Sequence, residues 1–197
     1  LLKDFFYNKI SERSEIEKST QVPILGEISY SKKLSNVLIP YRSRSIIAEQ
    51  LRLIRANLQF FSSENKNQTI LVTSFISGEG KSFTAINLAN SLAATQAKVL
   101  LIDIDLRKPK VDEYLKINSS KGLTDFLVKN TPIEEIIIHH SGETNFDVIT
   151  AGPVPPNPTE LLMRDKMNTL FEYTKAQYDY IVIDSSPVGL VADSFVT

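Results

Sequence analysis

Gly78, Gly80, Lys81 and Ser82 are the residues of this 197-residue chain whose types and spacing most clearly predict chemistry. They follow a run of apolar residues that predicts a buried strand, and they precede apolar residues that recur at helical spacing. Glycines let backbone N–H groups close around phosphate oxygens, and the start of a helix adds the positive end of its dipole. In such a P-loop, Lys81 would contact the β- and γ-phosphates of a nucleotide, and the Ser82 hydroxyl would bind Mg²⁺.

One position departs from the usual P-loop pattern. The first glycine of G-x-x-x-x-G-K-[ST] falls at position 75, where this chain has Phe75. An ordinary strand–turn–helix with a chance Gly-Lys-Ser is therefore the alternative interpretation. If the stretch is a P-loop, we expect the nucleotide to contact Ser77, Gly78, Glu79, Gly80, Lys81, Ser82, Phe83 and, from further along the chain, Arg107.

Two carboxylates follow a second apolar run. Val99 to Ile102 predicts a strand buried on both faces of a parallel sheet, so Asp103 and Asp105 would lie at its C-terminal end, where ligands bind in open α/β sheets. With one residue between them, both side chains lie on the same side while the chain stays extended. Because two neighbouring carboxylates repel, they need a cation or a shared proton, and Mg²⁺ on ATP would supply that cation. Arg107 is placed to neutralise one of them or to contact a phosphate.

A third apolar run, Tyr180 to Ile183, ends in Asp184, the usual position of a carboxylate that holds Mg²⁺ directly or through water. Three such strands together predict a nucleotide site with Lys81, Asp103 and Asp105 as catalytic residues. Ser82, Asp103 and Asp184 are the expected metal-binding residues. Either Asp103 or Asp105 would accept the proton of the attacking hydroxyl, and the sequence leaves open which one.

The composition excludes several other classes of site. The chain has 42% hydrophobic and 23% charged residues, a net charge of −1 and no cysteine. A disulfide framework and a thiolate zinc site are therefore impossible, and no broad attraction to nucleic acid is expected. His139 and His140 are expected to end a helix rather than to bind metal. No apolar run approaches the roughly 20 residues that span a membrane.

Three motifs carry a family resemblance. SGEGKS, LLIDIDLR and IVIDSSP resemble the Walker A, Walker A′ and Walker B motifs of the bacterial protein-tyrosine kinases (BY-kinases), in the MinD/ParA-like branch of P-loop proteins. The partitioning ATPases of that branch usually carry a signature lysine where this chain has Ile76, and its absence is more similar to the kinases. The resemblance extends over nearly the whole chain through PILGEI, EQLRLIR, GLTDFL and AGPVPPNPTELL.

The resemblance implies an ATP- and Mg²⁺-dependent protein-tyrosine (auto)kinase that regulates capsular or exopolysaccharide polymerisation and export. It would work on the cytoplasmic side of the bacterial inner membrane. Its implied partners are other copies of itself in a ring, the tyrosine-bearing tail of a neighbouring subunit, and a membrane co-polymerase segment, either upstream or in a separate chain; no nucleic acid is expected. The alternatives are a MinD/ParA-like ATPase with water as the nucleophile, and a nucleotide-gated assembly module without kinase activity.

Glu49, Arg52 and Arg55 lie in a helix expected at residues 45–61, where their spacing of three points them away from its apolar stripe. A solvated helix face is one interpretation. The resemblance implies another, because E-x-x-R-x-x-R is the oligomer-contact motif of the family.

The order of elements predicts an α/β, P-loop NTPase-type fold with a mostly parallel sheet and helices on both faces. Residues 1–44 would form an N-terminal helix and linker, and residues 45–197 the ATP-binding kinase domain. Short helices are expected at 111–116, 123–129 and 133–139, a strand at 146–150, and one helix after the proline-rich loop up to about Lys175. The first residue is not Met, and related folds continue beyond the third strand, so we expect a fragment whose domain is incomplete at the C-terminus.

Overall fold

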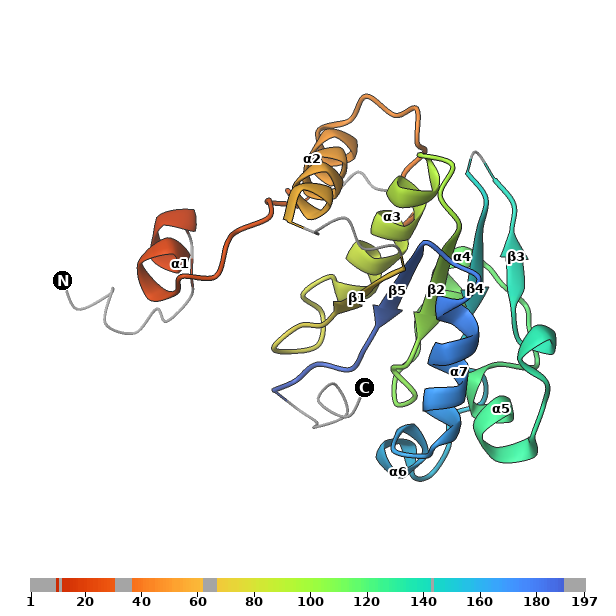
Figure 1. Ribbon diagram of the computed structural model, residues 1–197. Coiled ribbons are helices and arrows are strands. Elements are labelled where there is room, and N and C mark those ends of the chain that lie inside the picture. Colours follow the sequence, from red (N-terminus) through yellow and green to blue (C-terminus); the bar gives the residue numbers. More distant parts are fainter. Residues whose placement is uncertain (1–9, 11, 31–36, 62–66, 143, 190–197) are drawn as a thin grey trace.

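A five-stranded sheet forms the centre of the computed structural model, which describes residues 10, 12–30, 37–61, 67–142 and 144–189 (Figure 1). The strand order is β1–β5–β2–β4–β3, and the first four strands in this order run parallel. Only β3 is antiparallel, at the edge beside β4. The prediction of a mostly parallel sheet is therefore confirmed. The strands are β1 (Gln68–Val72), β2 (Val99–Asp103), β3 (Ile138–His140), β4 (Phe146–Ile149) and β5 (Tyr180–Asp184).

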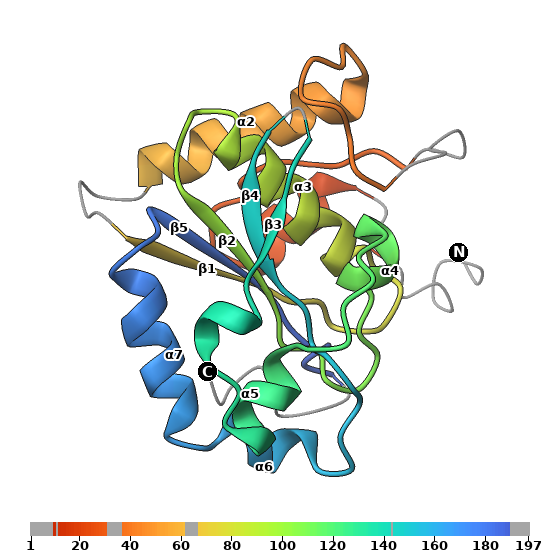
Figure 2. The ribbon, with the colours of Figure 1, turned by 90° about the vertical axis from the view of Figure 1, so that its right-hand side faces the viewer.

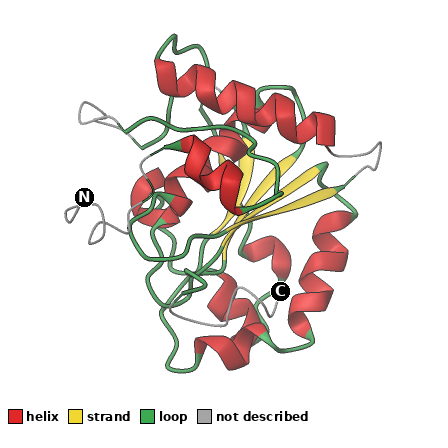
Figure 3. Ribbon diagram, turned by 90° about the vertical axis from the view of Figure 1, so that its left-hand side faces the viewer, coloured by secondary structure: helices red, strands yellow, loops and turns green. Residues whose placement is uncertain are grey.

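Helices cover both faces of this sheet, because alternate residues of its buried strands point to opposite sides. Leu100 and Ile183 pack in one hydrophobic core with α5 (Leu123–Lys129), α6 (Pro158–Leu162) and α7 (Lys166–Lys175). Leu101 and Val182 pack in a second core, on the opposite face, with α3 (Lys81–Ala93) and α4 (Val111–Leu115). Figures 2 and 3 show the resulting three layers, with α2 (Ile46–Phe61) lying outside α3.

Hydrogen bonds from two buried asparagines hold the chain segment before α2 against α3. The Ile39 N–H donates to Asn87 Oδ1 at 2.7 Å, and Asn90 Nδ2 donates to the Ile39 carbonyl at 2.8 Å. Ile39 also packs with Ile47 and Leu51 of α2 in a small third cluster. Further upstream, α1 (Arg13–Ser19) buries none of its residues. The rest of the expected N-terminal helix falls partly outside the described residues.

Two of the predicted helices were wrong. Residues 133–139 form a short 3₁₀ turn, Ile133–Glu135, followed by β3. A run of β-branched isoleucines favours an extended chain, and His139 pairs with Asp147 across the sheet. His139 and His140 therefore belong to a strand and do not end a helix. Instead of one helix reaching Lys175, there are two, α6 and α7. The break between them coincides with contacts from Arg164 and Lys166 to backbone carbonyls at the end of α5.

Backbone hydrogen bonds join the three segments that leave the carboxyl ends of β1, β2 and β5. The Ile104 N–H donates to the Asp184 carbonyl at 2.8 Å, and the Ser185 N–H donates to the Val72 carbonyl at 3.1 Å. The segments that carry the predicted site are therefore held side by side at one edge of the sheet. Within the described residues, no helix is both long and apolar enough to cross a membrane.

Candidate active site

The loop between β1 and α3 has the backbone geometry that its glycines allow. Gly78 and Gly80 both have φ of +93°, in the left-handed region that side chains disfavour, and Gly80 lies directly before the first residue of α3. The Glu79 carboxylate accepts the N–H groups of Phe75 at 2.9 Å and Ile76 at 3.2 Å. Phe75 does not have a positive φ, so its backbone has no need of the glycine that the usual pattern places there.

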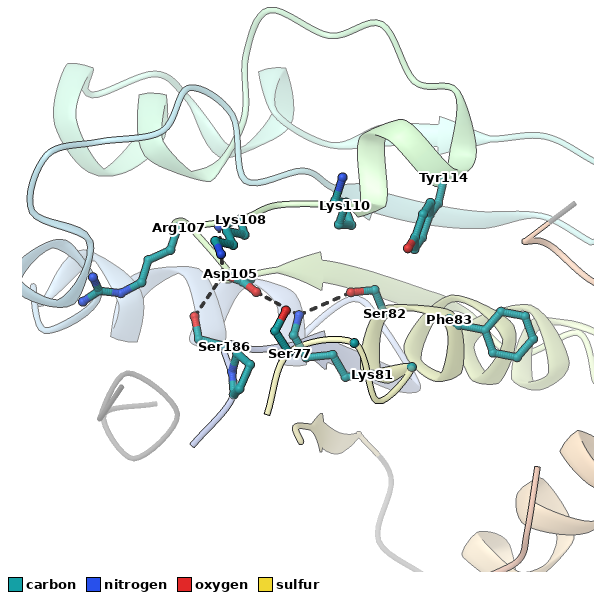
Figure 4. Close-up of a pocket in the computed structure, with 13 residues that line it drawn as sticks. Ser77, Lys81, Ser82, Phe83, Asp105, Arg107, Lys108, Lys110, Tyr114 and Ser186 are labelled. Carbon is teal, nitrogen blue, oxygen red and sulfur yellow. Dashed lines mark hydrogen bonds and ion pairs between the residues drawn. The ribbon is translucent and has the colours of Figure 1, made fainter. Parts of the chain in front are cut away.

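Lys81 connects this loop to the carboxylates of the neighbouring strands. Its Nζ lies 2.9 Å from Asp105 Oδ2 and 3.3 Å from Ser82 Oγ (Figure 4). The same Nζ lies 3.3 Å from Asp184 Oδ1. Burial alone would lower the pKa of Lys81. The charge of Asp184 and the hydrogen bond and charge of Asp105 outweigh burial and raise that pKa. The lysine is therefore a charged ammonium that is shared by two carboxylates.

Asp105 faces the same cavity as an ionised carboxylate. Burial raises its pKa, but the hydrogen bond and the charge of Lys81 outweigh burial, so the pKa lies below its ordinary value. Its Oδ1 accepts hydrogen bonds from the Lys108 N–H and the Ser186 hydroxyl, each at 3.1 Å. Asp105 is thus oriented from three sides, as a group that accepts a proton from a substrate must be.

Asp103 and Asp184 lie deeper, opposite one another on β2 and β5, and both are fully buried. Asp103 accepts the N–H groups of Asp105 at 3.0 Å and Val111 at 3.3 Å. Burial and then the charge of Asp184 raise the pKa of Asp103 well above its ordinary value. Burial also raises the pKa of Asp184, against the lowering effects of Lys81 and Ser82. Asp103 therefore organises the loop after β2, and it does not line the cavity.

The cavity at this edge of the sheet has a volume of about 330 Å³. Eight of the residues predicted from the sequence line it, namely Ser77, Gly78, Gly80, Lys81, Ser82, Phe83, Asp105 and Arg107. Three other predicted site residues do not line it, because Asp103 and Asp184 are buried and Glu79 is exposed on the loop. Sequence reasoning missed five lining residues, which are Lys108, Lys110, Tyr114, Ser186 and Pro187. The basic run that follows Asp105 was the signal for the two lysines.

The residues beneath the cavity fit a divalent cation bound together with phosphates. Asp184 Oδ2 is a buried carboxylate oxygen for which the described residues supply no hydrogen-bond partner. Ser82 Oγ lies beside the same lysine ammonium as Asp184 Oδ1. The described part of the chain contains no cluster of three or more carboxylate or imidazole groups placed to hold a metal. Mg²⁺ in nucleotide sites is usually bound by one or two carboxylates and by substrate phosphates, and Ser82 with Asp184 matches that sparse set of ligands.

The predicted oligomer-contact residues lie on α2, away from this cavity. Arg52 donates to the carbonyls of Tyr41 at 2.8 Å and Ser43 at 2.6 Å, and it pairs with Glu49 at 2.5 Å. Arg55 donates to the Ser91 carbonyl at 2.7 Å. Both arginines therefore make bonds within their own chain. Their contact with a second copy stays a prediction.

Comparison with known proteins gives concordant results. The model of the AAA domain family matches residues 67–195, more than half of the chain. The tyrosine-protein kinase YwqD of Bacillus subtilis (strain 168) is 41% identical over 164 residues, which cover 83% of this chain and 69% of that protein. The kinase domain of the Escherichia coli tyrosine kinase ETK superposes with a TM-score of 0.85 at 30% identity, over 95% of this chain and 78% of that domain.

A more distant likeness links the fold to a wider group. The cell division ATPase MinD of Pyrococcus furiosus has a TM-score of 0.56 at 26% identity, over 66% of this chain and 54% of that one. The motifs, the sheet and the cavity thus agree with the resemblance that the sequence carries. This chain belongs to the bacterial tyrosine-protein kinase family, which is built on the P-loop nucleotide-binding fold shared with MinD.

Proposed function

We propose that this chain transfers the γ-phosphate of ATP to tyrosine hydroxyl groups. The observation that carries the proposal is the ammonium of Lys81, which follows the phosphate-binding glycines and contacts Asp105 within one cavity. A cation for the transferring phosphate and a base for the acceptor hydroxyl are thereby brought together. The similarity to YwqD and ETK, both named as tyrosine kinases, supports tyrosine as the acceptor.

Lys81 must exchange partners when ATP binds. Its ammonium contacts Asp105 and Asp184, whereas P-loop lysines act by offsetting the charge of the β- and γ-phosphates. Once Lys81 turns to the phosphates, Asp105 loses the contact that lowers its pKa, while its burial remains. Its pKa then rises, and Asp105 becomes a better acceptor for the tyrosine proton. In this way phosphate binding switches on the base.

Ser82 and Asp184 are the residues that would hold Mg²⁺, which in such sites neutralises phosphate charge and orients the nucleotide. The backbone N–H groups from Ser77 to Ser82 would surround the phosphates at the start of α3. Asp103 keeps the loop that carries Asp105 in place through its bonds to two backbone N–H groups.

The likeness to MinD, a cell division ATPase, supports a second candidate function, which is ATP hydrolysis. The same cavity would then place water, and not a tyrosine hydroxyl, next to Asp105. The two functions differ in where the γ-phosphate goes, and that is directly measurable.

The cellular role that we propose rests on the family resemblance. The kinase would act on the cytoplasmic side of the bacterial inner membrane, in a ring of copies associated with a membrane co-polymerase segment. Phosphorylation of a neighbour's tyrosine-bearing tail would regulate capsular or exopolysaccharide polymerisation and export. Glu49, Arg52 and Arg55 would then contribute to the contact between copies.

The proposed activity is tested by replacing Lys81. The Lys81→Met chain, incubated with Mg-ATP and a tyrosine peptide, should form phosphotyrosine about a hundredfold more slowly or less, because a preorganised charge is lost at the transferring phosphate. A matched control is Lys175→Met, which removes a lysine from α7 near the opposite edge of the sheet. Circular dichroism should show both variants folded. Wild-type transfer by Lys81→Met would remove the P-loop from the mechanism.

A further inference from the structure

Three cationic side chains follow Asp105 along one wall of the cavity. Arg107, Lys108 and Lys110, which we call the basic rim, all line the cavity and are all exposed. Figure 4 shows them on the wall that faces Ser77 and Lys81 of the P-loop. The rim is held close to the base, because the Lys108 N–H is bonded to Asp105.

Among the described residues that line the cavity, cationic side chains outnumber carboxylates. The charge of Lys81 is already matched by Asp105 and Asp184. Arg107 donates to the Thr159 hydroxyl at 3.0 Å. Across the described residues, Lys108 makes no ion pair with its side chain. Since the described lining includes no carboxylate other than Asp105, the rim favours a ligand that brings its own negative charge.

A segment of this chain shows which kind of ligand fits. Lys110 pairs with Glu113 at 2.6 Å, and the next residue, Tyr114, lines the same cavity. The chain itself therefore places a tyrosine in the cavity and, on the residue before it, a carboxylate that pairs with a lysine of the rim. The pair of Lys110 and Glu113 is exposed and separated by three residues, so it is weak and easily exchanged for an incoming carboxylate.

The position of the rim also fits an acceptor peptide. In a peptide whose tyrosine hydroxyl reaches Asp105, consecutive Cα atoms lie about 3.8 Å apart. The residues next to that tyrosine would therefore pass the mouth of the cavity, where the rim lies. From this geometry, and given the tyrosine kinase activity proposed above, we infer that the basic rim selects acceptor tyrosines that have aspartate or glutamate next to them.

The test compares two peptides that differ only in charge. One carries a single tyrosine flanked by glutamates, and the other carries the same tyrosine flanked by glutamines. At saturating Mg-ATP, the wild-type chain should phosphorylate the glutamate peptide with a kcat/KM about five- to tenfold higher, mainly through a lower KM. In the Lys108→Glu, Lys110→Glu double variant the ratio of the two kcat/KM values should fall to about one or below. The KM for ATP is measured separately for each chain.

The control variant is Lys175→Glu, which makes the same kind of charge reversal on α7, at the other end of the sheet, and should keep the wild-type ratio. Equal kcat/KM for the two peptides with the wild-type chain would overturn the inference and leave the kinase activity standing. A double variant that keeps the wild-type peptide ratio but has a raised KM for ATP would also overturn it, because the rim would then serve the nucleotide. Absence of transfer to either peptide by the wild-type chain would overturn the proposed function and the inference together.

Discussion

At the scale of single residues, the ammonium group of Lys81 joins the phosphate-binding loop to the base. Removing a buried or half-buried cation from two carboxylates leaves uncompensated negative charge, so the P-loop lysine also stabilises the protein without nucleotide. The same contact lowers the pKa of Asp105. In the mechanism that we propose, phosphates would draw the lysine away, so that one side chain would serve both stability and the control of basicity.

Asp184 gives a prediction about stability and pH. Burial raises its pKa above the ordinary 3.8, so the folded chain binds this proton more tightly than the unfolded chain does. The free energy of unfolding therefore falls as the pH rises from about the ordinary value through the raised one. The Asp184→Asn variant has no such proton to lose, and it no longer repels Asp103.

We expect the free energy of unfolding of Asp184→Asn, relative to wild type, to be greater at pH 8 than at pH 5, while transfer is lost. Urea unfolding followed by circular dichroism at the two pH values measures this difference. Asp165, which is exposed at the start of α7, supplies the matched control variant, Asp165→Asn. A relative stability of Asp184→Asn that falls between pH 5 and pH 8 would contradict the account.

The sequence predicted which strands and loops bring the candidate site residues together, and the chemical roles of these residues stay predictions. The types and spacing of Lys81, Ser82 and Asp184 were sufficient, because a P-loop and the ends of parallel strands have fixed positions. The sequence could not predict that Asp105 lines the cavity while Asp103 is buried behind it. Alternation along an extended chain puts both on the same side, whereas the Asp105 N–H turns back to Asp103 and the chain bends there. The rim lysines were missed because only the path of the loop brings them to the cavity.

At the scale of elements, apolar runs and helical periodicity predicted the strands and helices that carry the site. The apolar run of β2 and the seven residues of α5 agree closely with the sequence prediction. Prediction was wrong at residues 133–139, where pairing of β3 with β4 overrides the helical pattern. Such pairing depends on a partner strand that local sequence does not reveal.

The attachment of residues 37–40 to α3 yields an element-scale prediction. Asn87 accepts from the Ile39 N–H and donates to the carbonyls of Val37 and Phe83. Asn87→Ala leaves the buried Ile39 N–H without its partner, so we expect a loss of about 1–3 kcal/mol in the free energy of unfolding.

Urea denaturation monitored by circular dichroism provides this measurement. The control is Asn168→Ala, because Asn168 is exposed on α7 and a change there should stay within about 0.5 kcal/mol. Equal stabilities of the two variants would show that the asparagine contacts do not hold the segment in solution.

At the scale of the whole molecule, the fold class followed from the order of strands and helices. The strand order β1–β5–β2–β4–β3 could not be read from the sequence, because each crossover can place the next strand on either side. The antiparallel edge strand was likewise not predicted. The structure does show that the helix face proposed for oligomer contact and the cavity are separate surfaces of one molecule.

Glu49 is the residue whose replacement tests the proposed ring most directly. Its side chain is 65% exposed and pairs only with Arg52 in the described structure, so Glu49→Lys should cost a monomer no more than about 0.5 kcal/mol. Reversal of Arg52 or Arg55 would instead break bonds to Tyr41, Ser43 and Ser91 within the chain.

In a ring, a contact is repeated at every interface, so Glu49→Lys should shift the mass measured by light scattering towards the monomer. Glu172→Lys, at an exposed position on α7, is the control and should keep the wild-type mass. The ring proposal is contradicted if Glu49→Lys has the wild-type oligomeric mass, or if the wild-type chain is monomeric at the same concentration.

The central claim is that Asp105 accepts the tyrosine proton while the γ-phosphate of ATP is transferred. The most direct measurement follows labelled γ-phosphate from Mg-ATP into phosphotyrosine and into inorganic phosphate in one reaction, for the wild-type and Asp105→Asn chains. We predict that the wild type labels tyrosine. Asp105→Asn should label it about 10²- to 10⁴-fold more slowly, while the Kd for Mg-ATP stays the same or falls, because Lys81 has one fewer competing partner. Wild-type rates with Asp105→Asn, or wild-type label found only in inorganic phosphate, would contradict the account.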